Sequence, residues 1–370
     1  MEITVKKISV PKGRRILAVS DIHGQWPFLE HLLEQTNFCD DDLLFIIGDI
    51  IEKGYENLAS LRYVMDLARR DNVTVLMGNV DLLRLQMLEN LSEDNCGKFY
   101  GYLLKMKEWR GTSIFDEMAA ELGLALDSPE QALASRPALL ESFRKELDFI
   151  RGLPAIAETE NYIFVHGGLP SEDLEAVKAG NIRDVLKFDN FMGSGLSFHK
   201  YVIVGHYPVS IYNQKIMQKN PLIDRGRHII SIDGGCGLQR DGQLNMLIIP
   251  EPDCETDKIT WMSWDDLPVF RALTAQEESE DPVNIEYLNR KIRILEEGEE
   301  FSRVEHADSG RKLKILTKNI YNHDGQWASA RHTDYLLPVR AGDRLSVIDE
   351  TSDGYFVKKD GVCGWYKGRF

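Results

Sequence analysis

Six side chains that bind metal ions well stand directly after short apolar runs of this sequence. In chain order they are Asp21 and His23 in "SDIHG", Asp49 in "GDIIEKG", Asn79 in "GNVD", His166 in "VHGGLP" and His206 in "VGHYP". Each has glycine beside it or close to it, which lets a backbone turn sharply and a ligand approach. Imidazole, carboxylate and amide oxygen together suit zinc, manganese or iron. The set therefore predicts a metal site, although any one of these residues alone would be an ordinary turn, cap or core residue.

The apolar runs that precede these residues read as strands of an α/β domain. "RILAVS", "DLLFIIGD" and "NVTVLMGN" alternate with amphipathic helical segments at 26–35 and 56–70. Later strand signals are "NYIFVHGG", "KYVIVGHY", "HIISIDGG" and "QLNMLIIP". A strand–helix alternation predicts parallel strands, and their carboxyl ends meet at one edge of the sheet. We therefore expect one domain over 1–266 in which the six side chains converge.

Residues 82–152 have helical patterns and no strand signal, as in "GKFYGYLLKMKEW" and "PALLESFRKELDFIRGLP". Two interpretations are open for this insertion. It forms a helical cap beside the site, or it is a helical layer packed on the sheet.

The chain changes character after the first domain. Residues 267–299 are rich in acidic residues and predict a linker with a short helix, "VNIEYLNRKIRIL". Residues 300–370 are short strand signals with Gly and Asp-Gly turns, a pattern that resembles an SH3-like barrel. Tyr355, Trp365 and Tyr366 either form a peptide-binding surface there or pack in the barrel core and against the enzyme domain.

Composition excludes several classes of function. The formal net charge of −15 argues against a nucleic-acid partner, which lysine and arginine would have to hold. No apolar run approaches the roughly 20 residues that cross a bilayer, and the N-terminus has no signal-peptide core, so we expect no membrane. Five scattered cysteines without a C-x-x-C pair favour reduced thiols and a cytoplasmic location. An anionic substrate would need a local cation in the site.

The order D-x-H, G-D-x4-G, G-N-x-D, H-G-G, G-H resembles the calcineurin-like metallophosphoesterases over about 15–250. The branch that is most similar contains the serine/threonine protein phosphatases and the bacterial diadenosine tetraphosphatases. This resemblance implies a β-sandwich flanked by helices and two divalent metal ions, Mn, Fe or Zn. Asp21, His23 and Asp49 would hold one ion, and Asp49, Asn79, His166 and His206 would hold the other. A hydroxide between the ions would attack phosphorus in line.

The same resemblance implies further roles. Asp49, His166 and Lys53 would be catalytic, and Lys53, Asn79 and Tyr207 would bind the substrate, a phosphorylated protein or small molecule. Glu52, Asp81 and Asp233 would support the ligands from behind.

The sequence departs from the family pattern at the residues that hold substrate. Lys53 stands where relatives have an arginine, and a lysine cannot grip two phosphate oxygens as a planar fork. Val80 replaces the histidine that protonates the leaving oxygen, and Glu52 replaces an aspartate. A further arginine is missing near Asp189 and Asn190.

These departures leave several readings. The enzyme acts on substrates with good leaving groups, as a phosphomonoesterase similar to protein phosphatases, or it uses another acid such as His199, Tyr207 or His228. A phosphodiesterase or nucleotide phosphohydrolase is the first alternative, because some phosphodiesterase branches also lack the histidine. A metal-bound scaffold with weakened catalysis is the second.

Overall fold

The computed structural model describes residues 1–370, and the chain forms two compact units. The first comprises residues 1–207 and 221–265, and the second comprises 208–220 and 266–370. The segment 208–220, which follows the predicted ligand His206 by two residues, thus belongs to the second unit. Each unit is described by itself.

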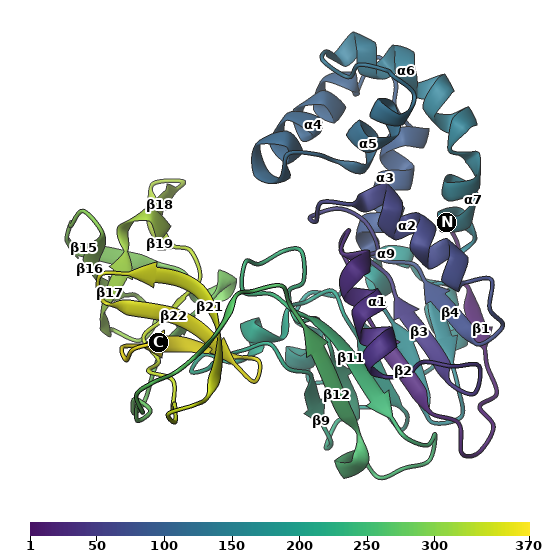
Figure 1. The fold of residues 1–370 in the computed structure, drawn as a ribbon. Coiled ribbons are helices and arrows are strands. Elements are labelled where there is room, and N and C mark those ends of the chain that lie inside the picture. Colours follow the sequence, from purple (N-terminus) through teal and green to yellow (C-terminus); the bar gives the residue numbers. More distant parts are fainter. The chain divides into compact units, whose positions relative to one another are not determined.

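Two sheets form the centre of the first unit (Figure 1). The five-stranded sheet has the order β12-β11-β2-β3-β4, and the six-stranded sheet has the order β1-β5-β6-β7-β10-β9. Strands β2, β3 and β4 run parallel, as do β6, β7 and β10. The strands are β1 (Val5–Lys7), β2 (Ile16–Val19), β3 (Leu43–Ile47), β4 (Val73–Leu76), β5 (Ile156–Glu158), β6 (Tyr162–Val165), β7 (Tyr201–Val204), β9 (Leu222–Asp224), β10 (Ile229–Ser231), β11 (Leu244–Ile249) and β12 (Thr260–Trp264).

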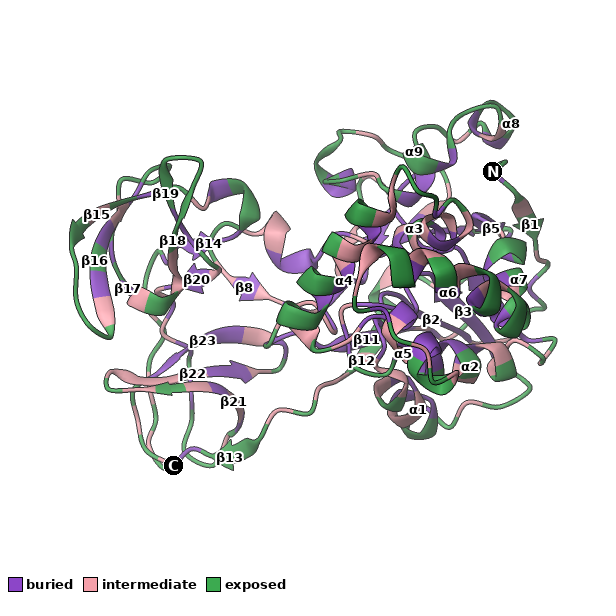
Figure 2. Ribbon diagram, turned by 90° about the horizontal axis from the view of Figure 1, so that it is seen from above, coloured by how far each residue is buried: buried purple, intermediate pink, exposed green.

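Apolar side chains from both sheets share one buried core. Phe45 of β3 stacks on Phe164 of β6 with ring centroids 3.8 Å apart, and Ile203 of β7 belongs to the same cluster. Figure 2 shows β2 and β3 in the colour of buried residues. Because both faces are covered, these strands are continuous apolar runs and do not alternate with polar residues. This packing gives the mixed α/β sandwich that the sequence predicts.

Nine helices surround or extend this sandwich. Helix α1 packs against β11 and β12 on the outer side of the five-stranded sheet, while α3 to α7 project beyond the ends of the strands (Figure 1). The helices are α1 (Trp26–Gln35), α2 (Asn57–Leu67), α3 (Asn79–Glu89), α4 (Cys96–Arg110), α5 (Ile114–Glu121), α6 (Pro129–Ser142), α7 (Arg144–Gly152), α8 (Leu174–Lys178) and α9 (Ile182–Leu186). Short 3-10 turns lie at Phe191–Gly193 and Thr256–Lys258.

The inserted helices are fixed to loops that follow the central strands. The backbone N–H of Ile114, at the start of α5, donates to Glu52 Oε1 at 3.1 Å. Arg110, at the end of α4, donates to the carbonyl of Leu238 at 2.9 Å. Of the two interpretations of the insertion, the structure favours helices anchored beside the strand ends over a layer lying on a sheet.

The second unit consists of small antiparallel sheets. Strands β13, β21, β22, β23 and β8 form one sheet, and β15, β16 and β17 form another. The strands are β8 (Met217–Gln218), β13 (Val269–Arg271), β14 (Asn284–Ile285), β15 (Ile292–Glu296), β16 (Phe301–His306), β17 (Lys312–Leu316), β18 (Ile320–His323), β19 (Gln326–Ser329), β20 (His332–Thr333), β21 (Arg344–Thr351), β22 (Gly354–Lys359) and β23 (Val362–Tyr366). Further 3-10 turns lie at Val209–Tyr212, Tyr287–Asn289 and Thr317–Asn319.

The prediction of a short helix within 267–299 is wrong. The segment "VNIEYLNRKIRIL" forms β14, a three-residue 3-10 turn and β15. Ile292 and Ile294 are β-branched and stand two positions apart, a spacing that suits a strand. Pairing of β15 with β16 fixes this conformation.

The aromatic residues near the C-terminus belong to the interior of the second unit. Tyr366 is fully buried, Trp365 is 8% exposed, and Tyr355 packs against the same cluster. The Nε1–H of Trp365 donates to the carbonyl of Thr333 at 2.8 Å. These side chains are core residues and do not form an open peptide-binding surface.

Candidate metal centre

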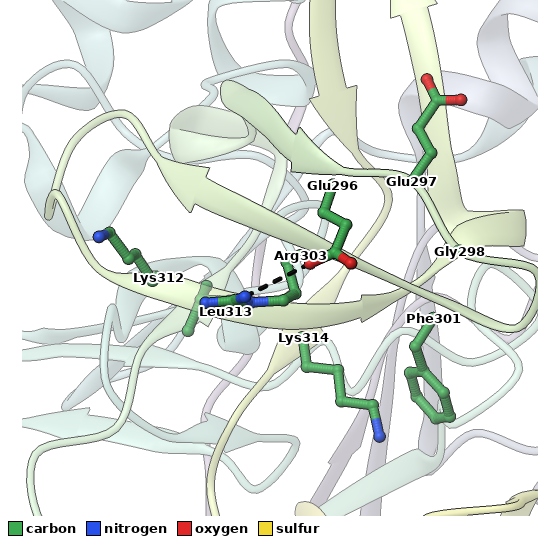
Figure 3. Close-up of a pocket in the computed structure, with 8 residues that line it drawn as sticks. All are labelled: Glu296, Glu297, Gly298, Phe301, Arg303, Lys312, Leu313 and Lys314. Carbon is green, nitrogen blue, oxygen red and sulfur yellow. Dashed lines mark hydrogen bonds and ion pairs between the residues drawn. The ribbon is translucent and has the colours of Figure 1, made fainter.

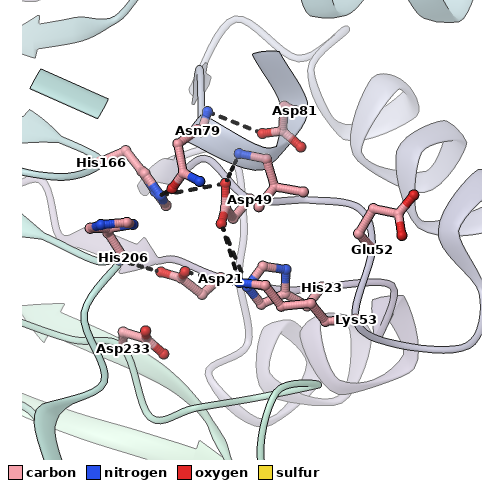
Figure 4. A network of polar contacts seen from close by, with 12 residues as sticks. Asp21, His23, Asp49, Glu52, Lys53, Asn79, Asp81, His166, His206 and Asp233 are labelled. Carbon is pink, nitrogen blue, oxygen red and sulfur yellow. Dashed lines mark hydrogen bonds and ion pairs between the residues drawn. The ribbon is translucent and has the colours of Figure 1, made fainter. Parts of the chain in front are cut away.

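The strand ends bring the predicted ligands together. Asp21 follows β2, Asp49 follows β3, His166 follows β6 and His206 follows β7, all at the carboxyl ends of parallel strands. Asn79 lies three residues after the end of β4 and is the first residue of α3. Figure 4 shows Asp49 at the centre of the group, with His23 on one side and His166 on the other.

Asp49 lies between the two buried histidines, His23 and His166. Its Oδ2 lies 3.6 Å from His23 Nε2, and its Oδ1 lies 3.4 Å from His166 Nε2. Asp21 Oδ1 lies 3.5 Å from His23 Nε2, and one ligand atom from each of Asp21, His23 and Asp49 falls within 4.8 Å of the others. On the far side of Asp49, Asn79 Oδ1 is 3.0 Å from His166 Nε2. Four of the other five predicted ligands therefore gather around the Asp49 carboxylate.

His206 completes the group from the side. Its backbone N–H donates to Asp21 Oδ2 at 2.9 Å, and its ring lies 5.3 Å from the ring of His166. Its Nε2, however, is 2.7 Å from Asp189 Oδ1. The backbone of His206 is thus part of the cluster, while its imidazole contacts a carboxylate that the predicted set did not include.

The hydrogen bonds of the two buried histidines fit a site for divalent cations. His23 Nδ1 faces the carbonyl of Ile51 at 3.1 Å, and His166 Nδ1 faces the carbonyl of Ile47 at 2.8 Å. A carbonyl only accepts, so each Nδ1 carries the hydrogen and each Nε2 presents a lone pair in the neutral ring. Those lone pairs face Asp49, and the buried Asp21 Oδ1 has no hydrogen-bond donor. Such a set of convergent acceptors is suited to two metal ions, and its mixed nitrogen and oxygen atoms match Mn, Fe or Zn.

The loops that carry the ligands hold strained backbone conformations. Asp21, His23, Asp49 and His206 all have positive φ, between 48° and 66°. Such conformations cost about 1–3 kcal/mol each for residues other than glycine, and they persist where the surroundings impose them. Gly205 is one reason for this geometry, because a Cβ there would lie 1.8 Å from Ser20 Oγ and 2.2 Å from Asp21 Oδ2.

The buried charges shift one another's pKa. Burial alone would raise the pKa of Asp49, but His166, His23 and Lys53 outweigh it and lower the pKa. Burial would lower the pKa of His166, and Asp49 and Asp21 reverse that effect and raise it. The pKa of Asp21 is likewise lowered by the two histidines against the effect of burial. The carboxylates therefore stay ionised, which is the state that binds metal.

Val80 contributes through its backbone. The Val80 N–H donates to Asp49 Oδ1 at 2.8 Å, and its side chain is 5% exposed. The next residue, Asp81, accepts from the N–H groups of Gly78 at 3.1 Å and Ile50 at 3.0 Å. Burial and the charge of Asp49 raise the pKa of Asp81 to about 7. The start of α3 thus orients the Asp49 loop, whatever the side chain at position 80.

The other two residues expected to support the ligands, Asp233 and Glu52, have different surroundings. Asp233 accepts from the N–H of Gly235 at 2.7 Å, and burial together with the charge of Asp21 raises the pKa of Asp233 to about 8. Glu52 faces the inserted helices instead of the ligands. Besides Ile114, its carboxylate contacts Arg84 Nε at 3.3 Å, and the Arg84 guanidinium lies over the Tyr102 ring at 4.3 Å. Glu52 therefore connects the loop to the insertion.

Lys53, which the sequence suggested as a substrate-binding cation, has its ammonium beside the ligand cluster. Its Nζ lies 3.0 Å from His23 Nε2 and 3.8 Å from Asp49 Oδ2. The side chain is 24% exposed, so the ammonium sits at the border between solvent and the buried carboxylates. From there it can meet a phosphate oxygen as a single point charge.

Two of the alternative acids lie at the wrong end of the sheet. His199 precedes β7 and His228 precedes β10, whereas the metal ligands follow these strands. His199 pairs with Glu172 at 2.5 Å, and His228 Nδ1 contacts the carbonyl of His199 at 3.0 Å. Both expectations are wrong, because residues at opposite ends of one strand cannot share a site. Tyr207, directly after His206, is 9% exposed and remains near the cluster.

Asp189 is the functional neighbour that sequence reasoning did not assign. It stands near the place where the family resemblance implies a phosphate-binding arginine, and it accepts from Lys187 Nζ at 3.0 Å as well as facing His206. Burial would raise the pKa of Asp189, but the hydrogen bonds to His206 and Lys187 lower it. An anion thus occupies a place where a cation was expected, and the only signal was its position in the stretch before the strand that leads to His206.

A separate cavity of about 410 Å³ lies on the β15–β17 sheet of the second unit (Figure 3). Two of its three cations already have partners. Arg303 pairs with Glu296 at 3.3 Å, and Lys314 lies 4.2 Å from the Phe301 ring and 3.2 Å from Asp353. No cluster of metal-binding side chains accompanies it, so it offers no alternative to the site around Asp49.

The order and geometry of these ligands agree with a comparison against known families. The model of the calcineurin-like phosphoesterases matches residues 14–227, more than half of the chain. This chain belongs to the calcineurin-like phosphoesterases. The expectation of a phosphoric ester hydrolase is thereby confirmed, as is the expectation that it binds divalent metal.

Individual relatives of this calcineurin-like phosphoesterase were also found. The symmetrical bis(5'-nucleosyl)-tetraphosphatase of Buchnera aphidicola subsp. Baizongia pistaciae is 34% identical over 88 residues, which are 24% of this chain and 31% of that protein. The enzyme of the same name from Vibrio parahaemolyticus is 29% identical over 162 residues, 43% of this chain and 47% of that protein. The chain thus spans at most about half the length of the curated relatives it matches.

A solved structure of a protein serine/threonine phosphatase from Saccharomyces cerevisiae is 12% identical, with a TM-score of 0.44. The match covers 72% of this chain and 85% of that one.

None of the helices is both long and apolar enough to cross a bilayer.

Proposed function

We propose that this chain hydrolyses phosphate groups attached to good leaving groups, at two divalent metal ions held around Asp49. One observation carries the proposal: the predicted metal ligands lie together, and the residue beside them, Val80, has a side chain that cannot donate a proton. Asp21, His23, Asn79 and His166 gather around Asp49, yet the residue that follows Asn79 offers only a backbone N–H to the site.

The ligand set supports the metal part of the proposal. Bound metal ions at this site would activate a water and neutralise phosphate oxygens. Asp21, His23 and Asp49 would hold one ion, and Asp49, Asn79, His166 and His206 the other. The carbonyls of Ile51 and Ile47 fix the two buried imidazoles in the tautomer that offers Nε2. Lys53 and Asn79 would orient the phosphate.

The side chain of Val80 supports the leaving-group part. A general acid contributes typically 10²- to 10⁴-fold, and valine has no proton to donate. Leaving groups that depart as stable anions lose little without an acid. Aryl phosphates and phosphoanhydrides are of this kind, whereas serine and threonine phosphates are not.

Among these substrates we favour nucleotide phosphoanhydrides. The curated relatives are named symmetrical bis(5'-nucleosyl)-tetraphosphatases, and cleavage at the centre of such a molecule releases a nucleoside diphosphate. This favours the nucleotide phosphohydrolase alternative over a protein-phosphatase-like monoesterase. An aryl monoesterase that accepts phosphotyrosine is the second candidate, and Val80 favours it equally.

The test is turnover by purified protein with Mn²⁺ on three substrates: diadenosine tetraphosphate, p-nitrophenyl phosphate and bis-p-nitrophenyl phosphate. We expect hydrolysis of the first two at rates well above that of the diester. Turnover of the diester alone would favour a phosphodiesterase. Absence of turnover on all three, with metal bound, would favour the scaffold alternative and end the proposal.

For the second unit we propose an SH3-like barrel built around β21, β22 and β23. Their antiparallel succession supports this, with β22 paired to both neighbours. The burial of Trp365 and Tyr366 gives no support to a peptide partner at those residues. A role within its own chain is therefore the proposal for this unit.

A further inference from the structure

A cavity of about 230 Å³ lies between helices α3 and α9, and one of its lining residues is the predicted ligand Asn79. The first two turns of α3 and the end of α9 each present one face to it. The lining residues are Asn79, Leu82, Leu83 and Gln86 from α3, and Arg183, Leu186 and Lys187 from α9 and its cap. These positions follow the three- and four-residue spacing of a single helix face.

The cavity combines an apolar floor with a cationic border. Leu82 and Leu186 are buried, while Leu83 is 41% exposed. Arg183 and Lys187 are exposed, and no acidic side chain is among the lining residues. In a chain with a net charge of −15, a cavity lined by two cations and no acidic side chain is a local reversal of sign, although Lys187 also pairs with Asp189 outside the lining.

The position of α9 relative to the metal ligands is fixed by the loop after His166. The N–H groups of Gly167 and Gly168 donate to the carbonyl of Val185 at 2.9 and 3.1 Å. A Cβ on Gly167 would lie 2.6 Å from the carbonyl carbon of Leu186. Only glycine permits this approach, so the residues that bear His166 also hold α9 against it. The cavity is therefore a built extension of the metal centre.

Lys187 links the border of the cavity to the site itself. Its ammonium pairs with Asp189 at 3.0 Å, and Asp189 faces His206 Nε2 at 2.7 Å. Arg183, one turn earlier on α9, has no ion pair. A substrate that reached from the metal centre into the cavity would meet Lys187 first and Arg183 next.

We propose that this cavity receives the leaving group, and that Arg183 and Lys187 bind a second phosphate on it. The inference rests on the proposed function and names its substrate class: a phosphoanhydride whose leaving group is a nucleoside phosphate. The leucines contact the sugar or base that follows. The volume is smaller than the roughly 300–1,000 Å³ of pockets that enclose a whole drug-sized ligand, so it accommodates one part of the substrate.

The experiment compares the variants R183Q and R183Q/K187M with the K178M control. Lys178 ends the neighbouring helix α8, pairs with Glu175 and does not line the cavity. For each protein with Mn²⁺, kcat/KM is measured on diadenosine tetraphosphate and on p-nitrophenyl phosphate. We expect the ratio of the two values to fall about tenfold for each cation lost, as for a charge-assisted hydrogen bond. We expect K178M to keep the ratio of the natural chain.

A binding measurement tests the same cavity without turnover. The Kd values for ADP and for orthophosphate are determined by calorimetry with Mn²⁺ present. In R183Q/K187M, we expect weaker binding of ADP by a factor of at least ten, with a much smaller change for orthophosphate.

The outcomes separate the two proposals. Two results would overturn the cavity assignment and leave the proposed function standing. One is turnover of both substrates by R183Q/K187M with an unchanged ratio of kcat/KM values. The other is equal weakening of ADP binding and orthophosphate binding in that variant. No turnover by the natural chain would overturn the proposed function, while ADP binding that depends on Arg183 would still support the cavity.

Discussion

Asp49 lies between two imidazoles, and its two carboxylate oxygens contact different neighbours. Oδ1 accepts from Val80 N–H and faces His166, while Oδ2 faces His23 and Lys53. This placement is the one that our proposal of two metal ions held around Asp49 requires. The residue-level predictions concern this carboxylate and the valine that supports it.

Replacement of Asp49 by asparagine should remove metal and activity together. Asn keeps an oxygen for the Val80 N–H but loses the charge that the two proposed ions would share. We expect at least a 100-fold loss of kcat, since even outer supports of a metal site contribute 10–100-fold. Metal content by elemental analysis and turnover of p-nitrophenyl phosphate check this. Full activity in D49N would contradict the assignment of the centre.

Replacement of Val80 by histidine should change activity according to the leaving group. A donor at this position would assist alkyl phosphates, with a gain of about tenfold or more if the imidazole reaches the leaving oxygen. Aryl phosphates and phosphoanhydrides should change little. The check is kcat/KM on phosphoserine-type and aryl substrates, with V80T as a polar variant of similar size. Equal gains on both would refute the explanation of Val80.

At the scale of elements, helix α5 caps helix α2. The N-cap residue of α2 makes no side-chain hydrogen bond, and the carboxylate of Glu117 takes over this role from another helix. It accepts from Asn57 N at 3.1 Å, from Asn57 Nδ2 at 2.6 Å and from Leu58 N at 2.7 Å. Asn57 Oδ1 in turn accepts from Glu52 N at 2.6 Å. The insertion thus stabilises the loop that follows Asp49.

Removal of this cap should destabilise the first unit. In E117A, three donors near the start of α2 lose their acceptor, and we expect a loss of about 2 kcal/mol in the free energy of unfolding. Urea unfolding measures it. E108A is the matched control, because Glu108 is an exposed residue of α4. Equal stability of the two variants would show that the cap contributes nothing.

A buried histidine of strand β20 should make the free energy of unfolding depend on pH. Burial lowers the pKa of His332 to about 4, and its Nε2 has no hydrogen-bond partner. The unfolded chain binds a proton near pH 6.5 and the folded chain does not, so stability falls as the pH decreases from 6.5 to 4. The whole effect is about 3 kcal/mol. Urea unfolding across this window should show a smaller decline in H332L than in the natural chain, whereas H323L, at an exposed hairpin residue, should follow the natural chain.

Sequence patterns located the strands and ligands of the first unit because both signals are local. A buried parallel strand is an apolar run, and each ligand follows one directly, as Asp21 follows β2. Partners distant in sequence carry no such signal. Asp189 at His206 and Glu117 at Asn57 depend on helices whose packing the pattern does not specify. The segment that forms β15 was predicted as a helix, and it is a strand because it pairs with β16.

At the scale of the molecule, the second unit is assembled from two separated parts of the chain. Strand β8 pairs with β23, Met217 is buried against Ile348 and Cys363, and Asn284 Nδ2 donates to the carbonyls of Ser210 and Asn213. No local signal marks 208–220 as part of this unit. The boundary near 266 that composition suggests is only one of three places where the chain passes between units.

A chain shortened to residues 1–265 should therefore fold poorly. It keeps 208–220 but loses every strand and core residue against which this segment packs, so buried apolar side chains such as Met217 become exposed. We expect a lower Tm and binding of a hydrophobic dye, compared with the whole chain. A monomeric fragment with the Tm of the whole chain would contradict this account.

The division of the second unit also bears on its inheritance. A module joined by one linker can be gained, lost or exchanged in a single recombination event at that linker. Here a break near residue 266 would separate β13–β23 from their edge strand β8, which is encoded just after His206. We therefore expect relatives of the second unit to occur with their own version of the segment 208–220.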